Sequence, residues 1–175
     1  MKNEHKSLGG AMGRRRMLAS AGLAAIALPI LSACGGGVEA VRKERSFRVS
    51  KTKAEWRSEL SDAEFRILRE AGTERAYSSP LHDSKRKGTY VCAGCGNKVY
   101  SSAHKFDSGT GWPSFYKPID GTAVGTSTDY KIGYPRTEVH CADCGGHLGH
   151  IFGDGPAPTG KRHCINGVAM DFIAA

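Results

Sequence analysis

The sequence predicts a mainly β domain that opens with short helices and is held together by a structural four-cysteine metal site. Twenty-three of the 175 residues are glycine, about twice the usual share, and most of them follow residue 88, which indicates many turns and short strands there. The motif Cys-x-x-Cys occurs twice, at Cys92 and Cys95 and again at Cys141 and Cys144. Hydrophobic residues make up 39% and charged residues 24% of the chain, a composition typical of a soluble globular protein.

Residues 1–33 have the features of an export signal. Three arginines, Arg14 to Arg16, precede an apolar stretch from Ala19 to Leu31 that is shorter than the roughly 20 residues needed to span a bilayer. The arginines resemble a twin-arginine signal, and Leu31-Ser32-Ala33-Cys34 resembles a bacterial lipobox, whose cysteine is acylated. We therefore expect an exported protein of the periplasm or cell envelope with a lipid anchor on Cys34. An ordinary cleaved signal is the alternative.

A flexible basic tether is expected over residues 34–52, followed by one domain over residues 53–175. Gly35-Gly36-Gly37 fits a flexible leader. The formal net charge is +8, but much of the excess lies in residues 1–33 and between Arg42 and Arg57. We interpret this run as a solvated tether that assists binding to an anionic membrane surface, and a specific acidic partner is the alternative. Charge placed in this way gives little support to nucleic-acid binding.

Two helices are expected at the start of the domain. Thr52 can cap a helix that runs to about Leu60. The capping box Ser61-Asp62-Ala63-Glu64 predicts a second helix from about Asp62 to Ala71, with Gly72 as its stop. The apolar side chains expected on the buried faces are Trp56, Leu60, Phe65, Ile67 and Leu68. The polar segment 77–87, which contains Pro80, is expected to be a loop.

Each Cys-x-x-Cys pair follows a strand-like lead-in and ends in glycine, as in a rubredoxin-like knuckle. Two such knuckles supply four thiolates, which favour a tetrahedral Zn²⁺ without an open position and therefore a structural site. The ion would join the two ends of the long insert between residues 95 and 141. Two disulfides or two redox dithiols are the alternative, which the exported location permits.

Cys164 has no cysteine neighbour in the sequence. It follows Arg162 and His163, and nearby positive charge favours a thiolate. We expect a strand from Arg162 to about Asp171 that holds this cysteine. His163 could add charge beside Cys164, but we favour the interpretation that it alternates to the opposite face of the strand.

The segments just before Cys164 supply candidate site residues. His147 and His150 follow the second knuckle, and because four cysteines saturate a zinc ion, a role near a reactive thiol suits them better than metal binding. The loop 106–115 is rich in glycine and proline but holds Trp112 and Phe115, which is typical of a pocket wall. A turn covered by a buried tryptophan is the alternative.

Several segments together carry a family resemblance. They are Cys92-x-x-Cys95, Ser108-Gly109-x-Gly111-Trp112-Pro113-Ser114-Phe115, Cys141-x-x-Cys144, Gly146-His147-Leu148-Gly149-His150-x-Phe152, Asp154-Gly155-Pro156 and Arg162-x-Cys164-x-Asn166. In this order, over about residues 53–173, they resemble the B-type methionine sulfoxide reductases. The resemblance implies two antiparallel sheets flanked by N-terminal helices, with a zinc site remote from the pocket. It also implies reduction of the R epimer of methionine sulfoxide in proteins and peptides, a repair of oxidative damage.

The resemblance assigns a role to each candidate residue. Cys164 corresponds to the nucleophile that attacks the sulfoxide sulfur, and Arg162 is a plausible stabiliser of its thiolate. Trp112 resembles the residue that packs on the substrate methyl group, and Phe152 is expected in the same substrate pocket. The polar residues expected to orient the substrate and help protonate the departing oxygen are His147, His150 and Asn166.

This chain departs from the family pattern at Thr110, where many members have a second, resolving cysteine. The remaining cysteines are assigned to zinc or to the lipid anchor. We therefore expect an external thiol, from a thioredoxin-like protein or a small dithiol, to reduce the Cys164 sulfenic acid. His163 and Gly167 also replace the aromatic residue and the serine common in the family.

Two other classes of protein compete with this interpretation. A nucleic-acid or protein adaptor would use zinc knuckles, basic charge and aromatic residues, but the sequence places no basic stripe through the knuckles. A thiol-disulfide oxidoreductase would use Cys92 or Cys141 in place of Cys164. Nothing in the sequence demands more than a monomer.

Overall fold

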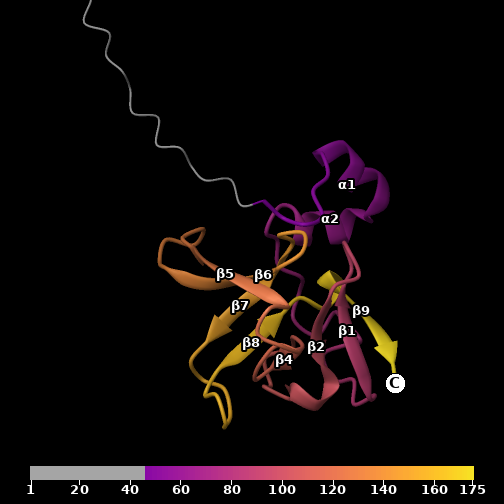
Figure 1. Cartoon of the computed structure of the whole chain (residues 1–175). Coiled ribbons are helices and arrows are strands. Elements are labelled where there is room, and N and C mark those ends of the chain that lie inside the picture. The colour runs from indigo at the N-terminus through magenta and orange to yellow at the C-terminus, as the bar shows by residue number, and fades with distance from the viewer. Residues whose placement is uncertain (1–45) are drawn as a thin grey trace, which may run out of the picture. The chain divides into compact units, whose positions relative to one another are not determined.

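The computed structural model describes residues 46–175 (Figure 1). The expected export signal at 1–33, the lipid anchor on Cys34 and most of the tether lie outside this range, so these expectations stay predictions. Within the described range, no helix is both long enough and apolar enough to cross a membrane.

Both expected helices form, and a reciprocal capping box begins each. At the start of α1 (Lys53–Glu59), Thr52 accepts from the Glu55 N–H at 3.2 Å, and the Glu55 carboxylate accepts from the Thr52 N–H at 2.7 Å. Ser61 and Glu64 make the same exchange before α2 (Asp62–Leu68). Each exchange satisfies N–H groups that the first turn of a helix leaves without a partner.

The second helix is shorter than expected. It ends at Leu68, not at Ala71, because Ala71 takes a left-handed conformation with φ of 48° that ends the regular turns. The N–H of Gly72 then returns to the carbonyl of Arg66 at 2.9 Å. The expected inner faces are confirmed for Trp56, Phe65, Ile67 and Leu68, which are the buried helical side chains. Leu60, the residue that caps the end of α1, is partly buried against the same core.

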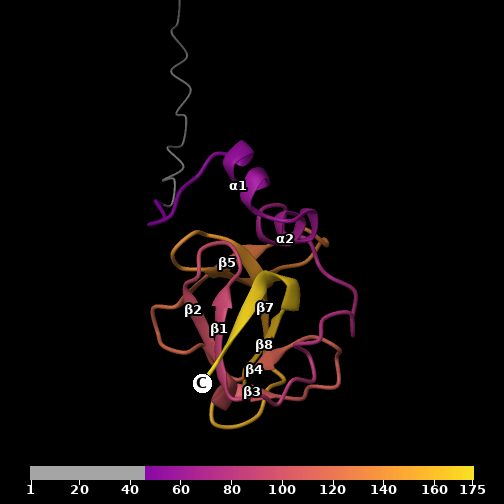
Figure 2. The same cartoon turned by 90° about the vertical axis from the view of Figure 1, so that its right-hand side faces the viewer.

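The described residues form two antiparallel sheets, which confirms the mainly β fold (Figure 1, Figure 2). The smaller sheet has the order β2-β1-β9 and the larger has the order β3-β4-β8-β7-β6-β5. The strands are β1 (Gly88–Cys92), β2 (Lys98–Ser101), β3 (Lys105–Phe106), β4 (Ser114–Phe115), β5 (Val124–Asp129), β6 (Arg136–Cys141), β7 (His147–Phe152), β8 (Arg162–Ile165) and β9 (Met170–Ala174). Both helices lie at one end of the sheets in the two views.

Aromatic side chains from both sheets build the core between them. Phe115 of the larger sheet stacks on Tyr100 of the smaller, with ring centroids 4.4 Å apart, and meets Tyr90 edge-on at 5.0 Å. All three side chains are fully buried. Such pairs add to the free energy gained by burial, so they fix the two sheets against each other.

The expected single strand from Arg162 to Asp171 is wrong. β8 ends at Ile165, a short 3₁₀ helix (Gly167–Ala169) follows, and β9 continues in the other sheet. The chain therefore crosses between the sheets directly after Cys164. The crossing is anchored by Glu74, whose carboxylate accepts from the N–H groups of Gly167 at 2.6 Å and Val168 at 2.9 Å.

Candidate active site and metal site

The four knuckle cysteines converge at one point. The sulfur atoms of Cys92, Cys95, Cys141 and Cys144 all lie within 4.8 Å of one another. The Cys92 and Cys144 sulfurs are 3.8 Å apart, and those of Cys95 and Cys141 are 3.6 Å apart. All four cysteines are free, since a disulfide needs about 2.05 Å between sulfurs. The structure therefore favours a shared metal site over two disulfides.

The knuckle backbone explains this convergence. Gly96 and Gly145 follow the second cysteine of each pair and have φ of 72° and 67°, a region open to glycine. Their N–H groups return to the carbonyls of Cys92 and Cys141 at 2.8 and 2.9 Å. One knuckle joins β1 to β2 and the other joins β6 to β7, so the site connects the two sheets.

The donor set fits Zn²⁺. Zn–S bonds of about 2.3 Å in a tetrahedron place sulfurs about 3.8 Å apart, close to the separations observed here. Arg69 donates to the Cys144 sulfur at 3.2 Å, and Asn97 donates to the Cys141 sulfur at 3.4 Å. Such donors compensate the negative charge that four thiolates carry around a divalent ion. Four cysteine ligands leave no open position, so the site can support the fold but cannot bind a substrate.

A separate cavity of about 160 Å³ brings together most of the other predicted site residues. Its lining residues are Thr73, Trp112, Arg136, Gly149, His150, Phe152, Cys164 and Asn166. His147 and Arg162 lie outside this lining. Thr73 and Arg136 were not predicted, because nothing in their local sequence distinguishes them from ordinary surface residues.

The strand register aligns polar side chains in one row across the larger sheet. Ser127 of β5 pairs with Glu138 of β6, Glu138 with His150 of β7, His150 with Cys164 of β8, and Cys164 with Ser114 of β4. Directly paired residues project from the same face with β-carbons about 5 Å apart. Cys164 thus lies within a polar row, between His150 on one side and Ser114 on the other.

Cys164 is held as a thiol more than as a thiolate. Burial raises the pKa of the Cys164 thiol above its ordinary value, and the Arg162 guanidinium and the Thr110 hydroxyl oppose this rise without cancelling it. The expectation of a thiolate stabilised by charge alone is therefore incomplete. Attack by this sulfur needs a neighbouring group that accepts its proton.

Arg162 is fixed in place by two contacts. Its Nε and Nη2 atoms donate to the two carboxylate oxygens of Asp154 at 2.9 Å each, a bidentate pair. Its guanidinium lies 4.5 Å from the centroid of the Phe152 ring. Arg162 and Cys164 share a strand face, so Arg162 can support both the thiol and the cavity wall.

His163 points to the opposite face, as we favoured from the sequence. Its side chain is buried beside Tyr100, whose hydroxyl lies 3.0 Å from the His163 Nδ1. Burial lowers the pKa of His163 to about 4, so the ring is neutral near pH 7. It therefore adds no positive charge beside Cys164.

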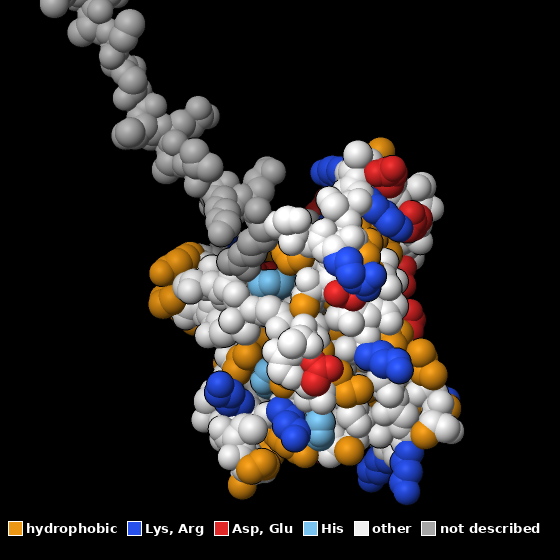
Figure 3. Space-filling view, viewed as in Figure 1, with side chains coloured by type: hydrophobic (Ala, Val, Ile, Leu, Met, Phe, Trp, Pro, Cys, Tyr) orange, Lys and Arg blue, Asp and Glu red, His pale blue; other side chains and the backbone are white. Residues whose placement is uncertain are grey.

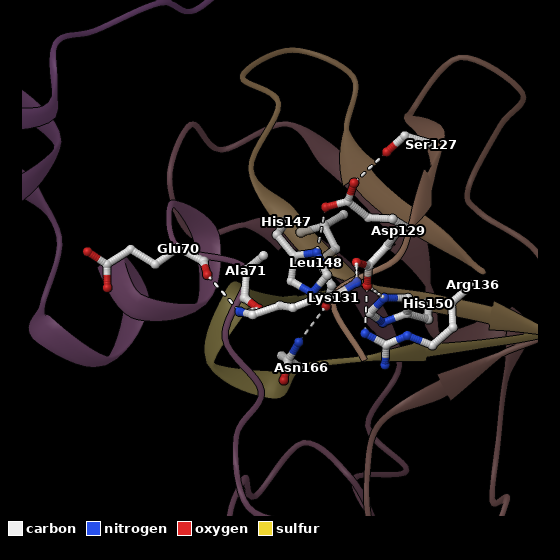
Figure 4. A network of polar contacts seen from close by, with 11 residues as sticks. Glu70, Ala71, Ser127, Asp129, Lys131, Arg136, His147, Leu148, His150 and Asn166 are labelled. Atoms are coloured by element: carbon white, nitrogen blue, oxygen red, sulfur yellow. Dashed lines mark hydrogen bonds and ion pairs between the residues drawn. The ribbon is translucent and has the colours of Figure 1, made fainter. Parts of the chain in front are cut away.

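Each histidine on β7 contacts a carboxylate (Figure 4). His147 Nδ1 lies 2.7 Å from Glu138 Oε1, and His150 Nε2 lies 2.8 Å from Asp129 Oδ2. The two imidazole rings meet edge-on with centroids 5.2 Å apart. The N–H of Lys131, with His150 and Arg136, holds the pKa of the Asp129 carboxyl well below its ordinary value.

Glu74 connects several parts of the site and was not predicted. Its backbone N–H donates to Asn166 Oδ1 at 2.9 Å, and its backbone carbonyl accepts from Trp112 Nε1 at 3.2 Å. Asn166 also donates to the Leu148 carbonyl at 3.0 Å. Asn166 is therefore largely occupied in holding the cavity wall, with one side-chain N–H left for a substrate.

Comparison with known proteins supplies the family. A model described as the SelR domain matches residues 60–174. This chain belongs to the SelR domain family. The MsrB proteins of this family include a relative in Thiobacillus denitrificans, named "Peptide methionine sulfoxide reductase MsrB", which is 53% identical over 122 residues, 70% of this chain and 92% of that protein.

Two further MsrB relatives agree. The protein from Leptospira interrogans is 48% identical over 127 residues, 73% of this chain and 97% of the relative. The one from Bradyrhizobium diazoefficiens is 50% identical over 132 residues, 75% of this chain and 95% of the relative. These matches confirm the family resemblance that the sequence motifs carry, over the residues that the SelR domain model covers.

The adaptor interpretation has little support on the visible surface. Figure 3 shows lysine and arginine side chains scattered over one face among acidic, apolar and neutral residues, not joined in one basic stripe. A nucleic-acid interface normally needs such a stripe. The alternative of a thiol-disulfide oxidoreductase that acts through a Cys-x-x-Cys pair is disfavoured as well. In this chain the four cysteines of both pairs fit the metal site.

Proposed function

We propose that this MsrB-family protein reduces the R epimer of methionine sulfoxide in proteins and peptides, with Cys164 as its nucleophile. The chain is a peptide methionine sulfoxide reductase, an oxidoreductase acting on methionine sulfoxide. The observation that supports the proposed mechanism is the shared cavity, in which a cysteine meets a histidine, an aromatic wall and hydrogen-bond donors.

Proton transfer is the first requirement of the mechanism. Cys164 has a raised thiol pKa, whereas burial lowers the pKa of His150 so that its imidazole is neutral and able to accept a proton. The two residues are direct partners on β7 and β8. In the proposal His150 takes the thiol proton as the sulfur attacks the sulfoxide sulfur, and the resulting imidazolium protonates the sulfoxide oxygen.

The oxygen then moves from substrate to enzyme. The S–O bond of the substrate breaks, methionine leaves, and Cys164 becomes a sulfenic acid, so the cysteine sulfur is oxidised as the substrate sulfur is reduced. Trp112 and Phe152 give the cavity an apolar wall for the substrate methyl group. Asn166 and Arg136 add hydrogen-bond donors to the cavity lining.

An external thiol completes the cycle in this proposal. Thr110 stands where many family members have a resolving cysteine, and the cysteines other than Cys164 in the described range cluster at the metal site. A thiol from a thioredoxin-like protein or a small dithiol attacks the sulfenic sulfur and releases water. A second thiol then breaks the mixed disulfide and restores Cys164.

The remaining parts of the proposal concern metal and location. Zn²⁺ bound by the four knuckle cysteines would supply structural cross-linking of the two sheets. Residues 1–33 would direct export, Cys34 would carry a lipid, and residues 34–52 would connect the anchored end to a monomeric domain in the periplasm or cell envelope.

Turnover of defined epimers tests this function. The full-length protein and Cys164→Ser would be incubated separately with dabsylated R and S methionine sulfoxide and dithiothreitol. We expect the wild type to convert the R epimer alone and the variant to convert neither. Turnover of the S epimer, or full activity in the variant, would contradict the proposal. Cys34→Ser is the matched control and should retain activity.

A further inference from the structure

The β5–β6 hairpin brings a carboxylate to the catalytic cavity. Asp129 ends β5 and pairs with Arg136, which begins β6, so these two residues close the base of the hairpin loop. Arg136 Nη2 lies 2.6 Å from Asp129 Oδ2. Arg136 lines the cavity beside Cys164, and Asp129 reaches the cavity through His150.

The two oxygens of Asp129 have different partners (Figure 4). Oδ1 accepts from the N–H of Lys131 at 2.7 Å, while Oδ2 faces both Arg136 and His150. The Lys131 ammonium group bonds to the carbonyls of Glu70 at 3.2 Å and Ala71 at 2.9 Å, directly after α2. The carboxylate is therefore oriented from its own loop, from β6 and, through Lys131, from the segment that follows α2.

This arrangement restricts where His150 carries its proton. An ionised carboxylate can only accept a hydrogen bond, so the ring nitrogen that faces Asp129 must carry a hydrogen. That nitrogen is Nε2, at 2.8 Å from Asp129 Oδ2. In a neutral imidazole the other nitrogen, Nδ1, then has a free lone pair. The hydrogen bond that the structure gives the His150 ring is the one from Nε2 to Asp129.

We propose that Asp129 is a positioning residue that holds neutral His150 in the Nε2–H tautomer and leaves Nδ1 as the acceptor for the Cys164 proton. The assignment of the tautomer rests on the Asp129 contact alone, whereas the role of Nδ1 as the proton acceptor rests on the proposed function. The charged and titratable groups around His150 are Asp129, Arg136, Glu138, His147, Arg162 and Cys164. Asp129 is the carboxylate among them that bonds to the His150 ring.

A purely structural role for Asp129 makes a different prediction. If the carboxylate served only to close the hairpin, its replacement would alter stability without changing the protonation of His150. Asp129→Asn separates the two cases, because an amide nitrogen in place of Oδ2 donates to Nε2 and shifts the hydrogen to Nδ1. Asp120→Asn is the matched control, since Asp120 accepts from the Thr122 N–H at 2.8 Å in a similar turn with no histidine partner.

Long-range ¹H–¹⁵N spectra of the full-length protein labelled with ¹⁵N measure the tautomer at neutral pH. The His150 signals are assigned by their loss in His150→Gln. We expect a protonated Nε2 and an unprotonated Nδ1 in the wild type and in Asp120→Asn. In Asp129→Asn we expect the Nδ1–H tautomer and a fall in kcat of about 100-fold, of the order lost with a general acid–base group.

The tautomer result and the activity result have separate meanings. A protonated Nδ1 in neutral wild-type His150 would overturn the inference even if the enzyme is active, and this measurement needs no variant to fold. An unchanged tautomer in folded Asp129→Asn would overturn it as well. If the tautomers are as expected but the wild type does not reduce methionine sulfoxide, the positioning role of Asp129 is supported and the proposed function is refuted.

Discussion

His150 and Cys164 lie directly opposite each other on the paired strands β7 and β8. This pairing places a buried neutral imidazole beside a thiol whose pKa is raised by burial. We expect His150→Ala to lower kcat by about 100-fold with a smaller change in KM, since the proton acceptor is lost and the apolar wall remains. Steady-state kinetics on the R-sulfoxide measure this effect. His104→Ala is the control and should keep wild-type kinetics, so an equal loss in both variants would contradict the assignment.

The Glu138–His147 pair should make stability depend on pH. The hydrogen bond from His147 lowers the pKa of Glu138 from its ordinary 4.5 to about 2. The ionised carboxylate therefore stabilises the fold above pH 4.5, and this contribution is lost as the pH falls towards 2. We expect Glu138→Gln to reduce the free energy of unfolding by about 1–2 kcal/mol at pH 7. Urea unfolding of both proteins at several pH values measures the difference, which should shrink below pH 4.5. A difference that stays constant down to pH 2.5 argues against the pair.

Loss of one knuckle cysteine should remove the metal and destabilise the domain. Structural zinc sites contribute on the order of 10 kcal/mol to apparent folding free energy, so Cys95→Ser should leave little folded protein. Elemental analysis should find about one zinc per wild-type chain and almost none in the variant, and thermal unfolding should show a greatly reduced Tm. Cys164→Ser is the control and should retain both zinc and Tm. Full zinc content in Cys95→Ser would show that this cysteine is not a ligand.

Glu74 should support the cavity without taking part in the reaction. Removing its carboxylate leaves the buried N–H of Gly167 and the partly buried N–H of Val168 without an acceptor, at a cost of about 1–3 kcal/mol for each. We expect Glu74→Ala to lower the free energy of unfolding by about 3 kcal/mol and to raise KM several-fold, because Trp112 and Asn166 bond to the same segment. Denaturant unfolding and steady-state kinetics measure these effects. The exposed Glu70→Ala should change neither, and a Glu74 variant with unchanged stability and KM would refute this role.

The sequence could predict features that depend on local spacing. The capping boxes of Thr52 and Ser61 fix both helix starts, and the glycine-ended Cys-x-x-Cys pairs predict the sulfur cluster that the structure contains. Alternation along a strand also separates His163 from Cys164. Each of these predictions rests on a pattern of residues a few positions apart, so the sequence alone carries the signal.

Features that depend on register or on chain reversal could not be predicted. Asp129 and Glu138 reach the histidines only through the pairing of β5, β6 and β7, which the sequence does not specify. The end of α2 depends on the left-handed Ala71, a residue with no local preference for that conformation. Likewise, the break between β8 and β9 depends on the distant carboxylate of Glu74. The raised pKa of the Cys164 thiol could not be predicted either. It depends on how far the folded chain buries this sulfur, and burial outweighs the nearby charge of Arg162.

The fate of oxidised Cys164 is the most direct test of the central claim. The full-length protein would react once with R methionine sulfoxide in the absence of any reductant, with dimedone present to trap sulfenic acid. Thr110→Cys would serve as a comparison, since its new thiol lies near Cys164 and should form a disulfide with it. In the wild type we predict about one methionine released per chain and a dimedone adduct on Cys164 by mass spectrometry. An intramolecular disulfide in the wild type, or release of methionine with Cys164 unmodified, would contradict the account.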